Sequence, residues 1–271
     1  MSAFTSHPTT VRVGIGGWTF EPWRKNFYPD GLPHDQELHF ASRRLSVIEV
    51  NGTYYSLQKA STYARWRDDT PEGFVFTLKA TRFATNRRVL AEAGESVERF
   101  VLSGIAELGP KLGPIVWQFA PTKRFDALDF EAFLKLLPSA VQGQALRHAV
   151  DVRHSSFACP EYLALARRYG VCNVFTESAD HPALADLTAD FVYARVMRTD
   201  ASEPEGLSPP VLASLADCAR SWHRGDEPTG LPRVEAPAPP GPPRDVFIFF
   251  IAGAKERAPA AALALKRQLD R

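Results

Sequence analysis

The stretch VIEVNGTYYS, residues 47–56, begins as a strand that looks buried on both faces and then turns polar just before an aromatic loop. Strand side chains alternate, so Val47, Glu49 and Asn51 share one face, while Ile48 and Val50 share the other. A buried charge without a partner is costly. Glu49 must therefore have partners, face water or take part in chemistry.

Short runs rich in Val, Ile, Phe and Tyr, the residues typical of strands, recur along the chain. They begin at Val11, Ser46, Phe74, Pro114, Arg147, Val171, Phe191 and Val246. Helix-like segments separate them at 35–44, 60–69, 86–108, 126–138, 160–170 and 208–224, and a last one covers 258–269. The connection after the sixth run is short.

This alternation predicts parallel strands with right-handed crossovers, and therefore a single (β/α)8 barrel, or TIM barrel, over residues 1–271. An open doubly wound sheet is the alternative, but no GxGxxG or GxxxxGK[ST] phosphate loop supports it. Residues 225–245 are rich in proline and lack apolar periodicity. We expect them to form an extended, partly disordered surface insertion before the last strand, on the N-terminal face of the barrel.

The composition excludes several classes of protein. A formal net charge of +1 gives no overall field that favours nucleic acid or a membrane surface. The three cysteines are scattered, which indicates reduced thiols and a cytoplasmic protein. Residues 1–10 lack the pattern of a signal peptide. The longest apolar run, which starts at Val246, is too short to cross a bilayer. No cofactor motif and no surface for a protein partner are evident.

Barrel sites are built at the carboxyl ends of the strands. Alternation places polar residues from at least five strands at that end, and the charged ones are Glu49, Lys79, Asp151, Arg153 and Arg195. Strand one adds Trp18, strand four Gln118, strand seven Tyr193, and strand six would add Asn173 and Glu177. The five charges sum to +1. We expect them to share one cavity and to hold Glu49 ionised through Lys79 or Arg153, although paired charges also occur purely as packing layers.

The loops after these strands add aromatic and basic residues, including Tyr54, Tyr55, Arg82, Arg87 and Arg88. They suit a ring-bearing or phosphorylated ligand, or they cap the barrel by packing.

His154 follows Arg153 and is a candidate acid or base, or a residue engaged in local hydrogen bonds. Glu49, Asp151, Glu177 and His154 could form an oxygen-rich metal site. Lys79 and Arg153 would compete with a cation there, so we expect no metal.

Five segments, GIGGWTFEPWRKNFYP, VIEVNGTYYS, TPEGFVFTLKA, LGPIVWQFAPT and VDVRHSSF, resemble the YecE-like family, known as domain of unknown function 72. The resemblance implies a (β/α)8 barrel and supplies no established activity. The chain departs from the family pattern at three places: at Asn86, where a histidine is usual; at Met197 and Arg198, in place of His-Gly; and at Ile251 and Ala252, in place of paired asparagines.

We therefore hypothesise a barrel enzyme, of hydrolase, lyase or isomerase type, that binds a small phosphorylated or carboxylated anion at its mouth. Glu49 would be the general acid or base, Lys79 an electrostatic stabiliser or imine-forming amine, and Asp151 a further catalytic carboxylate. The ligand-binding residues would be Trp18, Asn51, Tyr54, Gln118, Arg153, His154 and Arg195, with Arg153 and Arg195 as the anion clamp. A non-catalytic binding barrel and a nuclease-like barrel acting on nucleic acid are the alternatives.

Overall fold

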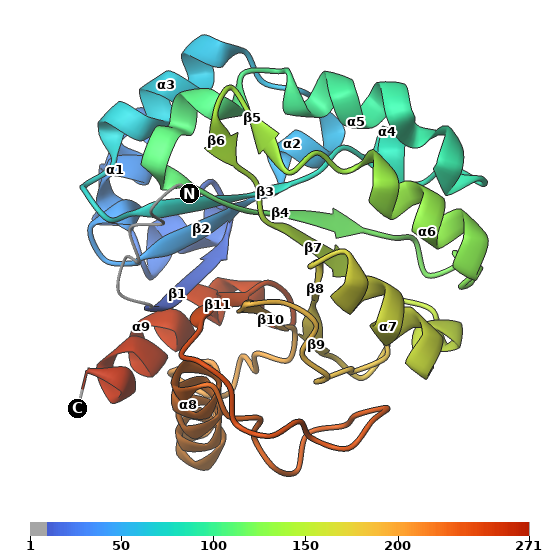
Figure 1. Ribbon diagram of the computed structural model, residues 1–271. Coiled ribbons are helices and arrows are strands. Elements are labelled where there is room, and N and C mark those ends of the chain that lie inside the picture. Colours follow the sequence, from blue (N-terminus) through green and yellow to red (C-terminus); the bar gives the residue numbers. More distant parts are fainter. Residues whose placement is uncertain (1–9, 271) are drawn as a thin grey trace.

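A computed structural model describes residues 10–270 of the protein. Residues 1–9, on which most of the signal-peptide argument rests, lie outside the described part. Parallel strands form the centre and helices surround them (Figure 1). The strands are β1 Val11–Gly16, β2 Val47–Val50, β3 Val75–Lys79, β4 Leu112–Gln118, β7 His148–Asp151, β8 Cys172–Asn173, β9 Phe175–Glu177, β10 Phe191–Val196 and β11 Asp245–Phe250. A small hairpin, β5 Ala140–Val141 and β6 Gln144–Ala145, lies outside the sheet.

The sheet closes into a barrel through the sixth strand of the prediction, which is interrupted at Val174. Its first half, β8, pairs with β7, and its second half, β9, pairs with β10. β11 then joins β10 to β1. The eight predicted strands and the (β/α)8 barrel are thus confirmed, with strand six divided between its two neighbours.

The helices largely follow the predicted segments. They are α1 Glu37–Ser42, α2 Gly52–Tyr55, α3 Ala60–Asp69, α4 Arg82–Thr85, α5 Gly94–Val101, α6 Ala127–Leu136, α7 Pro160–Arg168, α8 Pro209–Arg224 and α9 Ala258–Leu269. Short 3-10 turns cover Glu21–Lys25, His34–Gln36, Leu90–Ala93, Ile105–Lys111, Ser155–Phe157 and Lys255–Arg257. No helix within residues 10–270 is long and apolar enough to cross a membrane.

The predicted helix over 86–108 is wrong as one element. It is divided into a 3-10 turn, α5 and a second 3-10 segment. Gly104 has a φ of 108°, and a Cβ there would meet the Cα of Ala60 at 2.6 Å. A glycine is therefore required at this turn, and the helix cannot continue through it.

The barrel interior contains an apolar layer and, above it, a polar layer. Val47, Val75, Val116 and Tyr193 belong to one buried cluster inside the strands, and the larger core lies between strands and helices. Gly14 lets β1 and β2 approach, because a Cβ there would come within 1.8 Å of the Val47 carbonyl oxygen.

The expected side-chain direction of strand six is wrong. Cys172 and Val174 belong to the interior cluster, and the Thr176 hydroxyl donates to Asp151, so these three residues face inward. Asn173 accepts a hydrogen bond from Tyr162 of α7 instead. A slip of one residue moves every side chain of a strand to the opposite face.

The Pro-rich segment, residues 225–245, is an extended loop without helix or strand as far as Arg244, and its last residue, Asp245, begins β11. The loop is drawn in orange-red at the lower edge of Figure 1. It is more firmly attached than its composition indicated. The buried carboxylate of Asp186 accepts hydrogen bonds from the backbone N–H groups of Val234 and Glu235, both at 2.9 Å. The N–H of Ala185 donates to Pro232.

Candidate functional site

A cavity of about 520 Å³ opens at the carboxyl end of the barrel strands. Gly16, Asn51, Lys79 and Gln118 bring β1 to β4 to its wall, and the loop after β1 adds Trp18. Gly16 makes room for the amide of Asn51, because a Cβ at Gly16 would lie 2.9 Å from Asn51 Nδ2. The remaining lining residues are Gly17, Thr19, Val50, Gly52, Tyr55, Gln58, Trp66, Arg153, Arg195, Ile251 and Lys255.

Beneath this cavity, Arg195 is held between two carboxylates. Its Nη2 donates to Glu49 Oε1 at 2.8 Å, and its Nη1 donates to Asp151 Oδ2 at 2.5 Å. The second oxygen of Glu49 accepts from the Tyr193 hydroxyl at 2.6 Å, and the oxygens of Tyr193 and Thr77 are 3.0 Å apart. Glu49 and Asp151 are 0% exposed and Arg195 is 1% exposed. We call Glu49, Asp151 and Arg195 the buried ion cluster.

Arg153 and Gln118 connect the buried ion cluster to the cavity. Arg153 Nη2 donates to Asp151 Oδ2 at 3.1 Å and to Gln118 Oε1 at 2.8 Å. The same oxygen of Gln118 accepts from Arg195 Nη1 at 2.9 Å. These contacts fix both guanidinium groups.

The charges inside the cluster compensate for its burial. Burial by itself would raise the pKa of Asp151, but Arg195 and Arg153 outweigh it, and the pKa is lowered. Burial would likewise lower the pKa of Arg195, but Glu49 and Asp151 raise it. The pKa of Tyr193 is raised well above its ordinary range by burial and by Glu49. Asp151 and Arg195 therefore remain ionised, and Tyr193 keeps its proton.

Lys79 has a different environment. Its side chain is 8% exposed, it lines the cavity, and its Nζ lies 4.3 Å from the centre of the Tyr54 ring. Burial, followed by repulsion from Arg195 and Arg153, lowers its pKa to about 8, against the attraction of Glu49 and Asp151. The carbonyl oxygen of Lys79 accepts from Thr53 Oγ1 at 2.7 Å, which fixes the end of β3 against the loop after β2.

The structure changes several expectations for individual residues. Glu49 is paired with Arg195 rather than with Lys79 or Arg153. Of the three expected catalytic residues, only Lys79 lines the cavity, because Glu49 and Asp151 lie below Arg195. The expectation of one shared cavity is therefore wrong for the two carboxylates. Arg195 is also committed to them and is not a free anion clamp.

Two other expected ligand-binding residues stand away from the cavity wall. His154 Nδ1 is 2.9 Å from Ser156 Oγ and accepts from the Ser156 N–H, so the ring caps a local turn. Tyr54 packs on Lys79 and directs its hydroxyl towards Asn86, whereas its neighbour Tyr55 lines the cavity.

Three residues near the mouth were not singled out from the sequence. Lys255 follows β11, and its carbonyl accepts from the Trp23 indole, which holds the loop against the aromatic residues after β1. Trp66 of α3 contacts Trp18 edge to face at 5.1 Å. His181 follows strand six, and burial and then Arg153 lower its pKa. In the sequence, only their positions after strands or on a helix indicate that they belong to the site, and that indication is weak.

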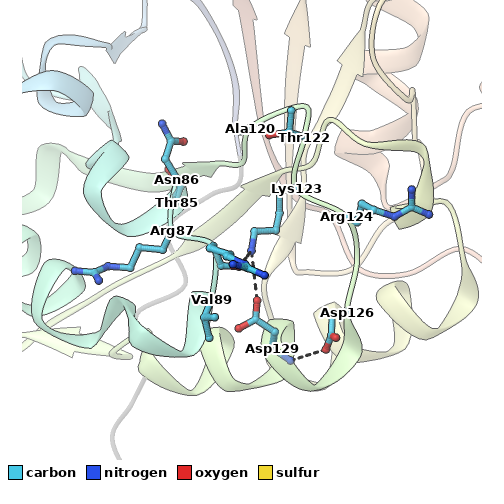
Figure 2. A pocket seen from close by; sticks show the side chains of 11 residues that line it. Thr85, Asn86, Arg87, Val89, Ala120, Thr122, Lys123, Arg124, Asp126 and Asp129 are labelled. Atoms are coloured by element: carbon cyan, nitrogen blue, oxygen red, sulfur yellow. Dashed lines mark hydrogen bonds and ion pairs between the residues drawn. The ribbon is translucent and has the colours of Figure 1, made fainter.

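A larger hollow of about 740 Å³ lies beside the mouth, between the loops after β3 and β4. Figure 2 shows that Lys123 and Asp129 point towards each other within it, while Arg87 and Arg124 extend away in opposite directions. Asp126 is engaged as the N-cap of α6, where it accepts from the Asp129 N–H. Because these charges are paired or directed outwards, we place the candidate site in the mouth cavity.

The donor set does not assemble a metal centre. Within residues 10–270, no group of three or more His, Cys, Asp or Glu side chains is placed to hold a metal ion. The two carboxylates at the mouth are already bonded to Arg195.

The fold and this site together define a (β/α)8 barrel with a basic cavity at the carboxyl end of its strands. The family described as "Protein of unknown function DUF72" matches residues 12–271, and the chain belongs to this family.

Curated relatives and solved structures agree with this family assignment. The chain is 26% identical over 147 residues to the UPF0759 protein YecE of Escherichia coli, a match that covers 54% of this chain and 50% of that protein. It is 25% identical over 116 residues to the UPF0759 protein YunF of Bacillus subtilis, covering 41% and 40%. The chain thus spans about half the length of the curated relatives it matches, or less.

Among solved structures, a DUF72 family protein from Thermotoga maritima has a TM-score of 0.73 at 22% identity, over 96% of this chain and 99% of that one. A DUF72 family protein from Enterococcus faecalis has a TM-score of 0.67 at 15% identity, over 98% and 99%. At these identities the likeness shows the fold alone.

Proposed function

We propose that the mouth cavity binds a small phosphorylated or carboxylated anion and that the protein is an enzyme in which Lys79 is the reacting group. One observation carries the proposal: the residues that line the cavity include four basic side chains and no Asp or Glu. The two acids of the barrel end lie below, bonded to Arg195. Arg195 and Arg153 together balance the charge of those two carboxylates, which leaves Lys79 and Lys255 as the net positive charge of the cavity.

The remaining cations favour an anionic ligand. Arg153 is 13% exposed and keeps Nη1 free of hydrogen bonds to residues 10–270, and Lys255 is half-buried. Partly desolvated cations attract anions more strongly than cations in bulk water do. The volume of about 520 Å³ suits a small molecule, since such sites span roughly 300–1,000 Å³. Trp18 and Trp66 supply an apolar wall for the uncharged part of the ligand.

The state of Lys79 favours an enzyme over a non-catalytic binding barrel. A binding site needs only a positive charge, whereas Lys79 is held where its ammonium form is disfavoured. Such lysines serve as bases or nucleophiles. A nuclease-like barrel is supported less, because the carboxylates that would hold its metal ions are bonded to a guanidinium. The three cysteines are free thiols, which supports a reducing compartment such as the cytoplasm.

Calorimetric titration with inorganic phosphate tests the binding part of the proposal. The wild-type protein should bind phosphate, and high salt should weaken the binding. Arg153→Gln should weaken it by at least about tenfold, because a hydrogen bond to a charged group contributes roughly 1.5–3 kcal/mol. Lys135→Gln removes an exposed lysine of α6 and is the matched control, which should bind like wild type.

Absence of phosphate binding by the wild-type protein would contradict the proposal. So would Arg153→Gln with wild-type affinity and a wild-type melting temperature. A loss of affinity shared by Lys135→Gln would show that net charge, rather than the cavity, holds the anion.

A further inference from the structure

The Lys79 amine faces the cavity without an acid beside it. No ion pair or hydrogen bond joins its Nζ to another residue of the described chain, and the ring of Tyr54 is its near neighbour. A lysine at 8% exposure normally has a carboxylate partner, because burial of an unpaired charge is costly. The arrangement therefore disfavours the ammonium form.

Arg195 takes the two carboxylates that could have formed an ion pair with Lys79. That guanidinium is planar and donates to Glu49 and Asp151 at once, which a single ammonium could not match in geometry. Arg153 donates a further hydrogen bond to Asp151. The cluster thus leaves Lys79 facing two guanidinium groups, an environment that lowers the proton affinity of an amine.

We propose that the cavity takes a small anionic carbonyl compound, an oxo acid or a phosphorylated ketone or aldehyde, and that Lys79 forms an imine with its carbonyl carbon. This inference rests on the anion site proposed above and names the substrate class for it. Arg153 and Lys255 would hold the anionic group while the carbonyl carbon meets Lys79 Nζ, since all three line one cavity.

The covalent step balances without an oxidant or reductant. The lone pair of neutral Lys79 Nζ attacks the carbonyl carbon, a C–N bond forms and the π bond of the carbonyl breaks. The oxygen takes one proton and the nitrogen loses one, which gives a neutral carbinolamine. The hydroxyl then takes a second proton and leaves as water while the nitrogen lone pair forms the C=N bond, and loss of the last nitrogen proton gives the imine. The rim is open to solvent at Thr19 and Tyr55, so water can deliver and remove the protons. With a pKa of about 8, a useful fraction of the amine is neutral near physiological pH.

Borohydride trapping tests the inference. The full chain is incubated with pyruvate or dihydroxyacetone phosphate at pH 8, reduced with sodium borohydride, and analysed by peptide mass spectrometry. At least one of the two probes should label Lys79 at least tenfold above every other lysine. Acetone, an uncharged ketone, should label it at least tenfold less than that probe. Lys79→Arg should reduce the label to background, and Lys135→Arg should not change it.

Phosphate titrations run in parallel separate this inference from the anion site. A Lys79→Arg variant that binds phosphate but takes no label supports both. If the wild type binds phosphate but neither probe labels it, or if the label falls on Lys255 or spreads over surface lysines, the imine is overturned and the anion site stands. If phosphate and both probes fail, both proposals fall. Lys79→Met replaces the arginine variant should the larger side chain prevent folding.

Discussion

Replacing Lys79 by methionine should make the protein more stable at neutral pH. The buried ammonium has a pKa of about 8 in the folded chain, against an ordinary value of 10.5. That difference corresponds to about 3 kcal/mol of folding free energy, which the folded state loses in full below about pH 8. Methionine is likewise unbranched, is one heavy atom shorter and carries no charge. We expect Lys79→Met to recover up to about 3 kcal/mol at pH 7, less any loss of packing on Tyr54.

The sign of the pH dependence is a sharper test. A lysine with a lowered folded pKa destabilises fully below about pH 8, and the penalty disappears as the pH rises from 8 to 10.5. Urea denaturation at pH 7 and at pH 10.5 should therefore show an advantage of Lys79→Met that is large at pH 7 and nearly absent at pH 10.5. Lys135→Met, at an exposed position, should show no such change. A stability difference for Lys79→Met that does not vary with pH would refute the argument.

Three further changes test the buried groups. Glu49→Gln should lower the free energy of unfolding by about 3 kcal/mol, because it removes one of the two charges that compensate Arg195. A thermal melt checks this, and an unchanged melting temperature would make Glu49 a candidate for the reacting group again. The pKa of Asp151 is lowered from 3.8, so the stability it contributes is present above pH 3.8 and is lost as the pH falls through the folded pKa. Acid titration followed by circular dichroism should show a smaller pH dependence in Asp151→Asn than in wild type, and equal slopes would count against this pairing. Asp186→Ala should cost about 2 kcal/mol in urea denaturation, since two backbone N–H groups of the Pro-rich segment lose a charged acceptor; a cost below about 0.5 kcal/mol would show that the segment is only loosely held.

The barrel could be predicted because the composition of the strands and their alternation with helices can be read from the sequence without knowing any side-chain contact. β2 shows why the site was partly predictable as well: Val47 and Ile48 mark the strand, and alternation then fixes the side of Glu49 and Asn51. The same reasoning failed in strand six. Its polar residues were assumed to face the mouth, but Asn173 satisfies its amide with the Leu184 carbonyl outside the barrel. Alternation allows either set of residues in a strand to face the barrel interior, and the packing of neighbouring side chains determines which set does.

The partners within the site were beyond the reach of the sequence. Alternation identifies which charges share an end of the barrel, but it does not say which cation takes which acid. That choice depends on how far each side chain reaches across the barrel. Arg195 extends from β10 to β2 and β7, and it bonds to both acids. The sequence therefore listed the members of the cluster and misassigned the partner of Glu49.

The pairing of the carboxylates with arginine explains why β2 ends in polar residues. Glu49 is too deeply buried to meet a ligand, yet it fixes Arg195 with help from Tyr193. Arg195 and Arg153 together compensate both carboxylates, and the pKa of Lys79 is lowered first by burial and then by these two guanidinium groups. Under the proposed function, Glu49 would act on the reactivity of Lys79 on the next strand without contact with the ligand. Loss of Glu49 should then be felt at Lys79 as a further fall in its pKa, because the attraction of that carboxylate is the largest influence raising it.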